Sequence, residues 1–249
     1  MNYHWNWAIF WEISPDGVHT YFQTLLMGTG WTLLTAAFAF IIALTFGSLI
    51  GVMRTTPSGF AVRAGDIYVE LFRNIPLLVQ MFLWYFVLPE LMPLTFGNWL
   101  KQVPNASFYT AVVALGLYMS ARIAEQVRAG VLSLPRGQRQ AGLALGLTLP
   151  QTYVYVLLPM AYRIIMPPLT SELLNTIKNS AVALTIGLME LTARARAMQE
   201  YSFQVFEAFT AATVIYIAIN VVVTFTMRLV ERHIAVPDYL GFKPPVAEH

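Results

Sequence analysis

The sequence predicts an all-α protein that is embedded in a membrane, with about five transmembrane helices. Of the 249 residues, 57% are hydrophobic and only 11% are charged, whereas a soluble domain carries roughly 25% charged residues. The mean hydropathy is +0.59. The apolar residues fall into long blocks separated by short polar connectors, so residues 1–249 are expected to form a single transmembrane domain.

Residues 1–21 are expected to lie in the outer membrane–water interface rather than to cross the bilayer. They combine many aromatic side chains with acidic ones and contain no Lys or Arg. Amphipathic rings settle at membrane interfaces, although a disordered tail is the alternative. No cleaved signal peptide is expected, because the first 50 residues hold no Lys or Arg for its positive region.

The first two spans are predicted at residues 22–53 and 68–92, with residues 54–67 as their connector. The first block is longer than a perpendicular span requires, which indicates a tilted helix. Its Gly47 and Gly51 would allow another helix to approach closely.

The second span carries two local features. Pro76 removes one backbone donor and would loosen the helix. Glu70 and Arg73 are one turn apart, so they are expected to form an ion pair on the helix surface.

The third, fourth and fifth spans are predicted at residues 107–131, 160–190 and 205–232. The fourth is the least apolar, and Pro167 and Pro168 are expected to interrupt it. Beyond them, six polar residues share an arc of roughly 160° at about 100° per residue. They are Ser171, Glu172, Asn175, Thr176, Lys178 and Asn179. One side of this helix should therefore face water or polar groups of a partner.

The distribution of Lys and Arg predicts the orientation in the membrane. The connectors on one side carry Arg54, Arg63, Arg128, Arg136, Arg139, Arg163, Arg228, Arg232 and Lys243. Those on the other side carry only Lys101, Arg194 and Arg196. Because positive residues accumulate on the cytoplasmic side, the N-terminus is expected outside, and the C-terminus and residues 133–159 inside.

Residues 133–159 form a short interrupted segment between apolar blocks. Ala141, Leu145 and Leu149 can make one apolar ridge, Thr148 is suited to begin a helix, and Gly146 permits a sharp bend. A bent pair of short helices would project from the cytoplasmic face. An ordinary amphipathic connector between two spans is the alternative.

The segment resembles the Glu-Ala-Ala-x3-Gly-x9-Ile-x-Leu-Pro signature of permease subunits in bacterial ATP-binding-cassette (ABC) importers. Ala141, Gly146, Leu158 and Pro159 match it, and Val156 replaces Ile. The two departures are Gln140 for Glu and Gly142 for Ala. In that family the loop docks into a groove of the ATPase. The resemblance therefore implies that docking involves Gln140, Ala141, Gly142, Leu145, Gly146 and Leu149.

Further segments narrow the resemblance to permeases for polar amino acids. The run from Phe72 to Gln80 reads Phe-Arg-Asn-Ile-Pro-Leu-Leu-Val-Gln, and the run from Ser120 begins Ser-Ala-Arg. Together they look most like glutamate/aspartate importer permeases. The resemblance implies an inner-membrane permease that pairs with a second permease chain, the same or related. Its other partners would be two cytoplasmic ATPase subunits, which bind the ATP, and an extracytoplasmic substrate-binding protein.

No catalytic group is expected in the chain itself. It has no cysteine, and its four histidines lie at the two ends; no metal-binding or phosphate-binding motif is present. A membrane enzyme would therefore lack a nucleophile or a metal set. A channel or secondary transporter for a small polar solute is the competing function, and it would need no ATPase.

Ionisable residues at membrane depth are the candidate substrate site. Arg122 lies about 22 Å along its helix in a hydrocarbon core of about 30 Å. We expect Arg122 and Lys178, helped by Asn175 and with Asn179 beside them, to hold the carboxylates of an amino acid, and Glu172 to take its ammonium group. The alternative is structural: Glu172 and Lys178 pair with each other or a neighbour, and Arg122 reaches the cytoplasmic surface.

Overall fold

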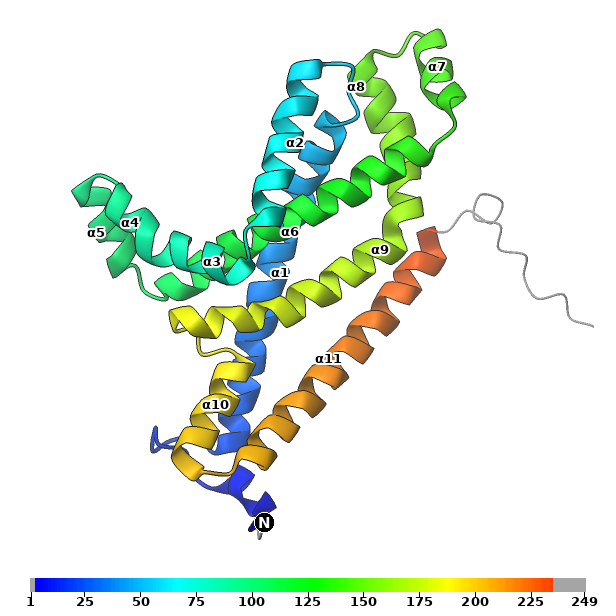
Figure 1. Ribbon diagram of the computed structural model, residues 1–249. Helices are drawn as coiled ribbons and strands as arrows, with labels where there is room; N and C mark the ends of the chain where they lie inside the picture. Colours follow the sequence, from blue (N-terminus) through cyan, green and yellow to red (C-terminus); the bar gives the residue numbers. More distant parts are fainter. Residues whose placement is uncertain (1–2, 235–249) are drawn as a thin grey trace, which may run out of the picture.

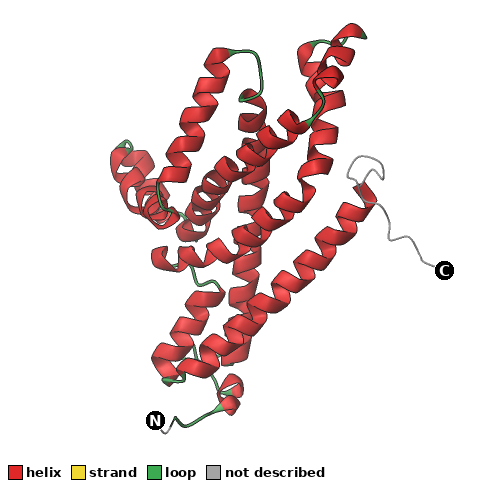
Figure 2. Cartoon of the chain, turned by 45° about the vertical axis from the view of Figure 1, so that its right-hand side comes forward, coloured by secondary structure: helices red, strands yellow, loops and turns green. Residues whose placement is uncertain are grey.

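The computed structural model describes residues 3–234, and its regular elements in this range are helices (Figure 2). The predicted all-α class is confirmed. Three helices are long and apolar enough to cross a membrane: α1 (Tyr21–Met53), α6 (Ala106–Ser133) and α11 (Val205–Ile234). Their bounds lie close to the first, third and fifth predicted spans.

The longest helix, α1, runs through the molecule and packs against α6 (Figure 1). A capping box at its start, in which Thr20 and Gln23 exchange hydrogen bonds, explains why it begins there. Gly47 and Gly51 lie directly against α6: a Cβ at either position would be 2.8 Å from a backbone oxygen of that helix. The predicted close approach of another helix is therefore confirmed.

The second span, expected at residues 68–92 with a helix loosened at Pro76, is broken into several elements. Helix α2 (Gly59–Asn74) begins earlier, and after it come α3 (Leu77–Phe82), a π-helical turn η2 (Leu83–Val87) and α4 (Leu88–Leu91). The chain bends by 99° between α2 and α3. Because the residue before a proline avoids the helical conformation, Ile75 is extended and Pro76 starts a new helix.

The connector expected at residues 54–67 is shorter than predicted. Ser58 caps α2 by accepting a hydrogen bond from the backbone N–H of Ala61. Pro57, Gly59 and the two arginines, Arg54 and Arg63, indicated a connector, but Gly65 and Val69 of α2 are buried on its inner face. It is an amphipathic helix.

The fourth block also differs from its prediction. Helix α8 (Leu149–Thr152), the π-helical turn η3 (Tyr153–Leu157) and α9 (Leu158–Asn179) follow one another without a gap, and Pro167 and Pro168 lie inside α9 without breaking it. Two prolines remove only two backbone donors, and packed neighbours hold the rest of the helix. The helix ends before the 3-10 turn η4 (Ser180–Ile186) instead of continuing to residue 190.

Not every predicted span passes a test of length and composition. Three described helices pass it, and a fourth span results if α2 to α4 are counted as one bent crossing. Helix α9 carries polar residues and is not among them. The count of five spans stays a prediction.

The elements give the molecule two opposite ends and a side arm (Figure 1). At one end lie the start of α2, α7 (Arg136–Ala144) and α8; at the other lie the N-terminal residues and α10 (Leu191–Ser202). The arm is formed by α3, η2, α4 and α5 (Leu94–Gln102). Helices α6 and α9 cross the middle.

The N-terminal residues pack against the start of α11. The Glu207 carboxylate accepts hydrogen bonds from the Tyr3 hydroxyl and, over 2.8 Å, from the backbone N–H of Asn6. Asp16 accepts from the backbone N–H groups of His19 and Val18, and these hydrogen bonds lower the pKa of its carboxyl group. This segment therefore has a defined fold in residues 3–20, and its place at the outer interface stays a prediction.

Candidate functional site

An ion pair joins α6 and α9 where the two helices cross. Arg122 donates from Nε to Oε2 of Glu172 over 2.7 Å and from Nη2 to Oε1 over 3.3 Å. The Glu172 side chain is 6% exposed and that of Arg122 is 42% exposed. One side of the guanidinium is thus accessible, while the other holds a carboxylate of its own chain.

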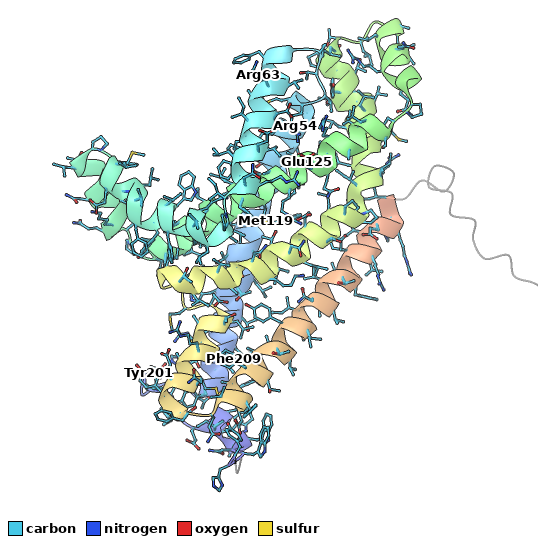
Figure 3. All side chains as sticks on the ribbon, in the orientation of Figure 1. Arg54, Arg63, Met119, Glu125, Tyr201 and Phe209 are labelled. Atoms are coloured by element: carbon cyan, nitrogen blue, oxygen red, sulfur yellow. The ribbon has the colours of Figure 1, made fainter. Side chains whose placement is uncertain are left out.

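The other predicted site residues gather less closely around this pair. Asn179 is near it on α9, with Nδ2 at 3.9 Å from Sδ of Met119, one turn before Arg122 (Figure 3 labels Met119). Asn175 is half-buried and Lys178 is exposed; within residues 3–234 neither side chain makes a hydrogen bond or ion pair. Lys178 is about 120° around the helix from Glu172, so these two do not pair.

The Arg122–Glu172 pair has the charges needed to bind an amino acid. A guanidinium carries five N–H donors, so donors remain after Glu172 has accepted two hydrogen bonds. If Arg122 and Glu172 separate, each charge is left uncompensated. An amino acid can compensate both, because it supplies a carboxylate for Arg122 and an ammonium group for Glu172. The assignment of Arg122, Glu172, Asn175, Lys178 and Asn179 to substrate binding stays a prediction.

Residues 136–152, here termed the coupling knob, have the bent shape that the sequence predicts. Helix α7 ends in a Schellman motif, in which the N–H of Gly146 donates to the oxygen of Leu143 and the N–H of Leu147 to the oxygen of Gly142. Gly146 has φ +82°, a left-handed conformation that favours glycine. Thr148 and Gln151 then form a capping box that starts α8.

The predicted apolar ridge of the coupling knob is divided in the structure. Gln140, Ala141 and Leu145 are exposed, and Leu145 is 83% exposed. Leu149 instead packs inward against the cluster formed around Leu157, because it belongs to α8 rather than to α7. The ridge of three side chains on one face is therefore wrong.

The glycine that replaces Ala in the family signature has a structural reason. A Cβ at Gly142 would lie 2.7 Å from Cγ2 of Thr152, so α7 and α8 approach each other closely at this point. Tyr153, the next residue, donates from its hydroxyl to the backbone oxygen of Thr55 over 2.8 Å. This contact ties the knob to the turn between α1 and α2.

A charge network lies beside that turn (Figure 3). Arg54, whose side chain is 7% exposed, contacts Asp66 of α2 over 2.7 Å and Glu125 of α6 over 3.1 Å. Arg73 contacts the same Glu125 oxygen over 3.1 Å. The predicted pair of Glu70 with Arg73 is therefore wrong, since the arginine reaches across to α6.

A buried carboxylate at the start of α10, Glu190, was not predicted from the sequence. Glu190 is 0% exposed and accepts hydrogen bonds from the backbone N–H groups of Thr192 and Ala193. It also accepts from the hydroxyl groups of Thr32 and Tyr216. An acidic residue directly before an amphipathic helix is a capping signal. This signal could have predicted Glu190 as the cap of α10.

Among residues 3–234 no group of three or more His, Cys, Asp or Glu side chains is arranged to hold a metal ion. The ionisable residues described above instead connect helices to one another.

Comparison with known proteins identifies the family. The profile described as "Binding-protein-dependent transport system inner membrane component" matches residues 43–236. The glutamate/aspartate import permease protein GltJ of Escherichia coli K12 is 48% identical over 246 residues, which cover 98% of this chain and 100% of that protein. The glutamine transport system permease protein GlnP of the same strain is 33% identical and covers 93% of this chain and 98% of its own length.

Solved structures agree with this result. An amino acid ABC transporter crystallised with histidines has a TM-score of 0.72 and 30% identity, over 86% of this chain and 95% of its own. The MetNI methionine ABC transporter has a TM-score of 0.70 over 90% of this chain and 100% of its own, and at 22% identity it shows the fold alone. This chain belongs to the family of binding-protein-dependent transport system inner membrane components.

Proposed function

We propose that this chain is the permease subunit of an ATP-driven importer that moves acidic amino acids, glutamate or aspartate, into the cytoplasm. The observation that carries the proposal is the 48% identity to a glutamate/aspartate import permease over 98% of the chain. Because the aligned region covers 98% of this chain, it takes in the coupling knob and both helices of the Arg122–Glu172 pair. The segments Phe72–Gln80 and Ser120–Arg122, taken together, resemble the same group.

The power source of the proposed importer lies in other chains. Two cytoplasmic ATPase subunits would bind ATP and grip the coupling knob, a second permease chain would complete the pathway, and an extracytoplasmic protein would deliver the substrate. The exposed face of α7, with Gln140, Ala141 and Leu145, supports this role because it offers a small protruding surface to a partner. ATPase closure would rock the helices and expose the site outward, then inward.

The proposed orientation places the coupling knob in the cytoplasm and the N-terminus outside. In support, Arg54 and Arg63 lie at the same end of the molecule as α7 (Figure 3), opposite the N-terminal residues (Figure 1). Arg136 and Arg139 belong to α7 and therefore lie at the same end, as expected for the cytoplasmic side. Lys243, also used in the prediction, lies outside the described residues.

The ATP dependence of uptake tests the proposed function. Proteoliposomes that contain the permease with its ATPase and binding protein should take up labelled glutamate and aspartate only when ATP is enclosed on the ATPase side. Labelled glutamine and arginine measure selectivity. Uptake without ATP would favour the channel or secondary transporter, and uptake of arginine in place of glutamate would refute an acidic substrate.

The substrate site is tested by removing single charges. Arg122→Ala should reduce the apparent affinity for glutamate about tenfold or more, because a hydrogen bond to a charged group is worth roughly 1.5–3 kcal/mol. Lys178→Ala tests the second cation. Arg196→Ala is the control, since Arg196 pairs with Glu200 at the surface. Unchanged uptake by both Arg122→Ala and Lys178→Ala at normal expression would remove these residues from the site.

Glu172 has a separate test. Glu172→Gln keeps the shape of the side chain but removes the charge that would hold the ammonium group. It should therefore reduce discrimination between glutamate and glutarate, which lacks that group. If glutarate competes equally weakly in the original protein and in the variant, Glu172 does not contact the ammonium.

A further inference from the structure

A cavity of about 680 Å³ lies in the arm, between η2 and α4, α5 and the first turns of α6. This volume is within the roughly 300–1,000 Å³ of pockets that hold small ligands. The cavity is distinct from the Arg122–Glu172 pair and from the coupling knob, and none of their residues line it. Its own lining therefore has to indicate what it binds.

The lining is almost entirely apolar, and much of it is aromatic. Trp84, Tyr85, Trp99 and Tyr109 contribute large rings, and aliphatic side chains fill the spaces between them. Trp99 is 58% exposed and Tyr109 is 56% exposed, so the rings form an open hollow rather than a closed core. Such a lining suits a hydrocarbon chain and offers too few polar partners to a free amino acid.

The charged side chains of the lining are Glu90 and Lys101, which face each other from α4 and α5. The Lys101 Nζ lies 2.6 Å from Oε1 of Glu90. The Glu90 side chain is 68% exposed and that of Lys101 is 43% exposed, so both charges remain accessible. This pair is complementary to a molecule with one negative group, which would contact Lys101, and one positive group nearby, which would contact Glu90.

The position of the arm agrees with a lipid ligand. The chain enters the arm from α2, which begins at the end that carries the coupling knob, and leaves it through α6, which returns toward that end (Figure 1). In the orientation of the proposed function, on which this step rests, the arm is therefore the outward turn between the second and third spans. Trp and Tyr are enriched where lipid headgroups meet hydrocarbon.

We infer that this cavity binds a phospholipid whose zwitterionic headgroup carries a primary ammonium, such as phosphatidylethanolamine. One acyl chain lies in the aromatic hollow, the phosphate contacts Lys101, and the ammonium donates to Glu90. An anionic lipid without an ammonium leaves Glu90 facing negative charge. A choline headgroup has no N–H to donate, so it makes the weaker contact.

Native mass spectrometry of the purified permease complex tests the inference. The complex is stripped of lipid and titrated separately with phosphatidylethanolamine, phosphatidylglycerol and phosphatidylcholine of the same acyl chains. Phosphatidylethanolamine should be retained most tightly. Lys101→Ala should weaken its retention about fivefold, the factor that corresponds to roughly 1 kcal/mol for one basic residue at a lipid surface.

A matched pair of variants separates this cavity from general lipid contact. Val113 lines the cavity, and Val113→Trp should obstruct its α6 side and weaken the preferred retention. Val221, 62% exposed on α11 and outside the cavity, provides the control Val221→Trp, which should change nothing. Equal retention of the three lipids, or no difference between the two variants, would overturn the inference.

A photo-crosslinker at position 113 identifies the occupant directly in membranes. Recovery of the crosslinked lipid supports the inference, whereas a crosslink to the second permease chain would show that protein covers the cavity and would overturn it. Lipid retention is read without transport. Failure of the proposed function, seen as loss of ATP-driven uptake, is therefore distinguishable from failure of this inference.

Discussion

Replacing Gly47 with Ala should destabilise the protein, whereas the same replacement of Gly30 should not. Both glycines lie inside α1, so the substitution removes the same backbone freedom at each position. A Cβ at Gly47 would lie 2.8 Å from the backbone oxygen of Ser120 and 2.8 Å from Cβ of Ile123 in α6. A Cβ at Gly30 would meet no atom within 4 Å.

The two effects have opposite signs. Alanine inside a helix is favoured over glycine by roughly 0.5–1 kcal/mol, and this gain applies to both positions. Overpacking costs typically 1–3 kcal/mol, and the upper part of that range applies at Gly47 because a backbone oxygen cannot rotate away. The free energy of unfolding should therefore fall by about 1–2 kcal/mol for Gly47→Ala and rise by about 0.5–1 kcal/mol for Gly30→Ala.

Thermal unfolding in detergent, followed by size-exclusion chromatography with fluorescence detection, measures the difference. For a chain of this size about 1 kcal/mol shifts Tm by roughly 2–4 °C, so Gly47→Ala should unfold about 2–8 °C below the original protein. Gly51→Ala should repeat this result, since its Cβ would lie 2.8 Å from the oxygen of Ala124. Equal Tm values for Gly47→Ala and Gly30→Ala would refute the close packing of α1 on α6.

Two further predictions concern the coupling knob and α10. Gly146→Ala should lower the free energy of unfolding by roughly 1–2 kcal/mol because the backbone of Gly146 is left-handed. It should also lower ATP-driven uptake, while Gly146→Asn retains more uptake. Gly137→Ala is the control, and equal uptake by all three variants would contradict the role of the bend. Glu190→Ala removes a helix cap worth about 0.5–2 kcal/mol. It also removes the carboxylate to which the half-buried Tyr216 hydroxyl donates, at about 0.5–1.5 kcal/mol, because the Thr192 hydroxyl remains 3.0 Å away as a partner. The yield of folded protein should therefore fall well below that of the surface control Glu200→Ala, and equal yields would contradict this account.

The helices that the sequence predicted best are those with long, mainly apolar runs. α1, α6 and α11 begin and end within about two residues of the expected blocks. At the start of α1 the capping box of Thr20 and Gln23 adds a local signal. Hydropathy therefore locates these elements without information from distant residues.

The second and fourth spans were harder to predict, because charged residues and prolines occur both in connectors and inside helices. Arg54 and Arg63, with Pro57 and Gly59, indicated a connector, yet two of the four charged residues of α2 form ion pairs with neighbouring helices: Asp66 with Arg54 and Arg73 with Glu125. Pro76 separates α2 from α3, with Ile75 before it extended, whereas Pro167 and Pro168 lie inside α9. Whether a proline breaks a helix depends on neighbours that satisfy the freed carbonyl groups, and these neighbours are remote in sequence.

The candidate site was predicted in composition but not in pairing. Membrane depth singled out Arg122 and Glu172 separately, because each carries a charge where burial is costly. Their contact depends on the angle at which α6 crosses α9, and this crossing angle cannot be predicted from the helical period of α9 alone. The same reason explains why Arg73 contacts Glu125 of α6 and not Glu70 on its own helix.

The arrangement of α9 provides a mechanical link between the two predicted sites. From Leu149 to Asn179 the backbone is continuously helical, and Thr152 and Glu172 are separated by about 30 Å along it. One end is joined to the coupling knob through the contact of Gly142 with Thr152, while α1 and α6 are locked together by close glycine packing. Because α9 passes over that locked pair, a tilt imposed at the knob changes the crossing of α9 with α6. Arg122 pairs with Glu172 at this crossing. We therefore expect movement of the knob to open or close the site at which a substrate carboxylate can replace the Glu172 carboxylate beside Arg122.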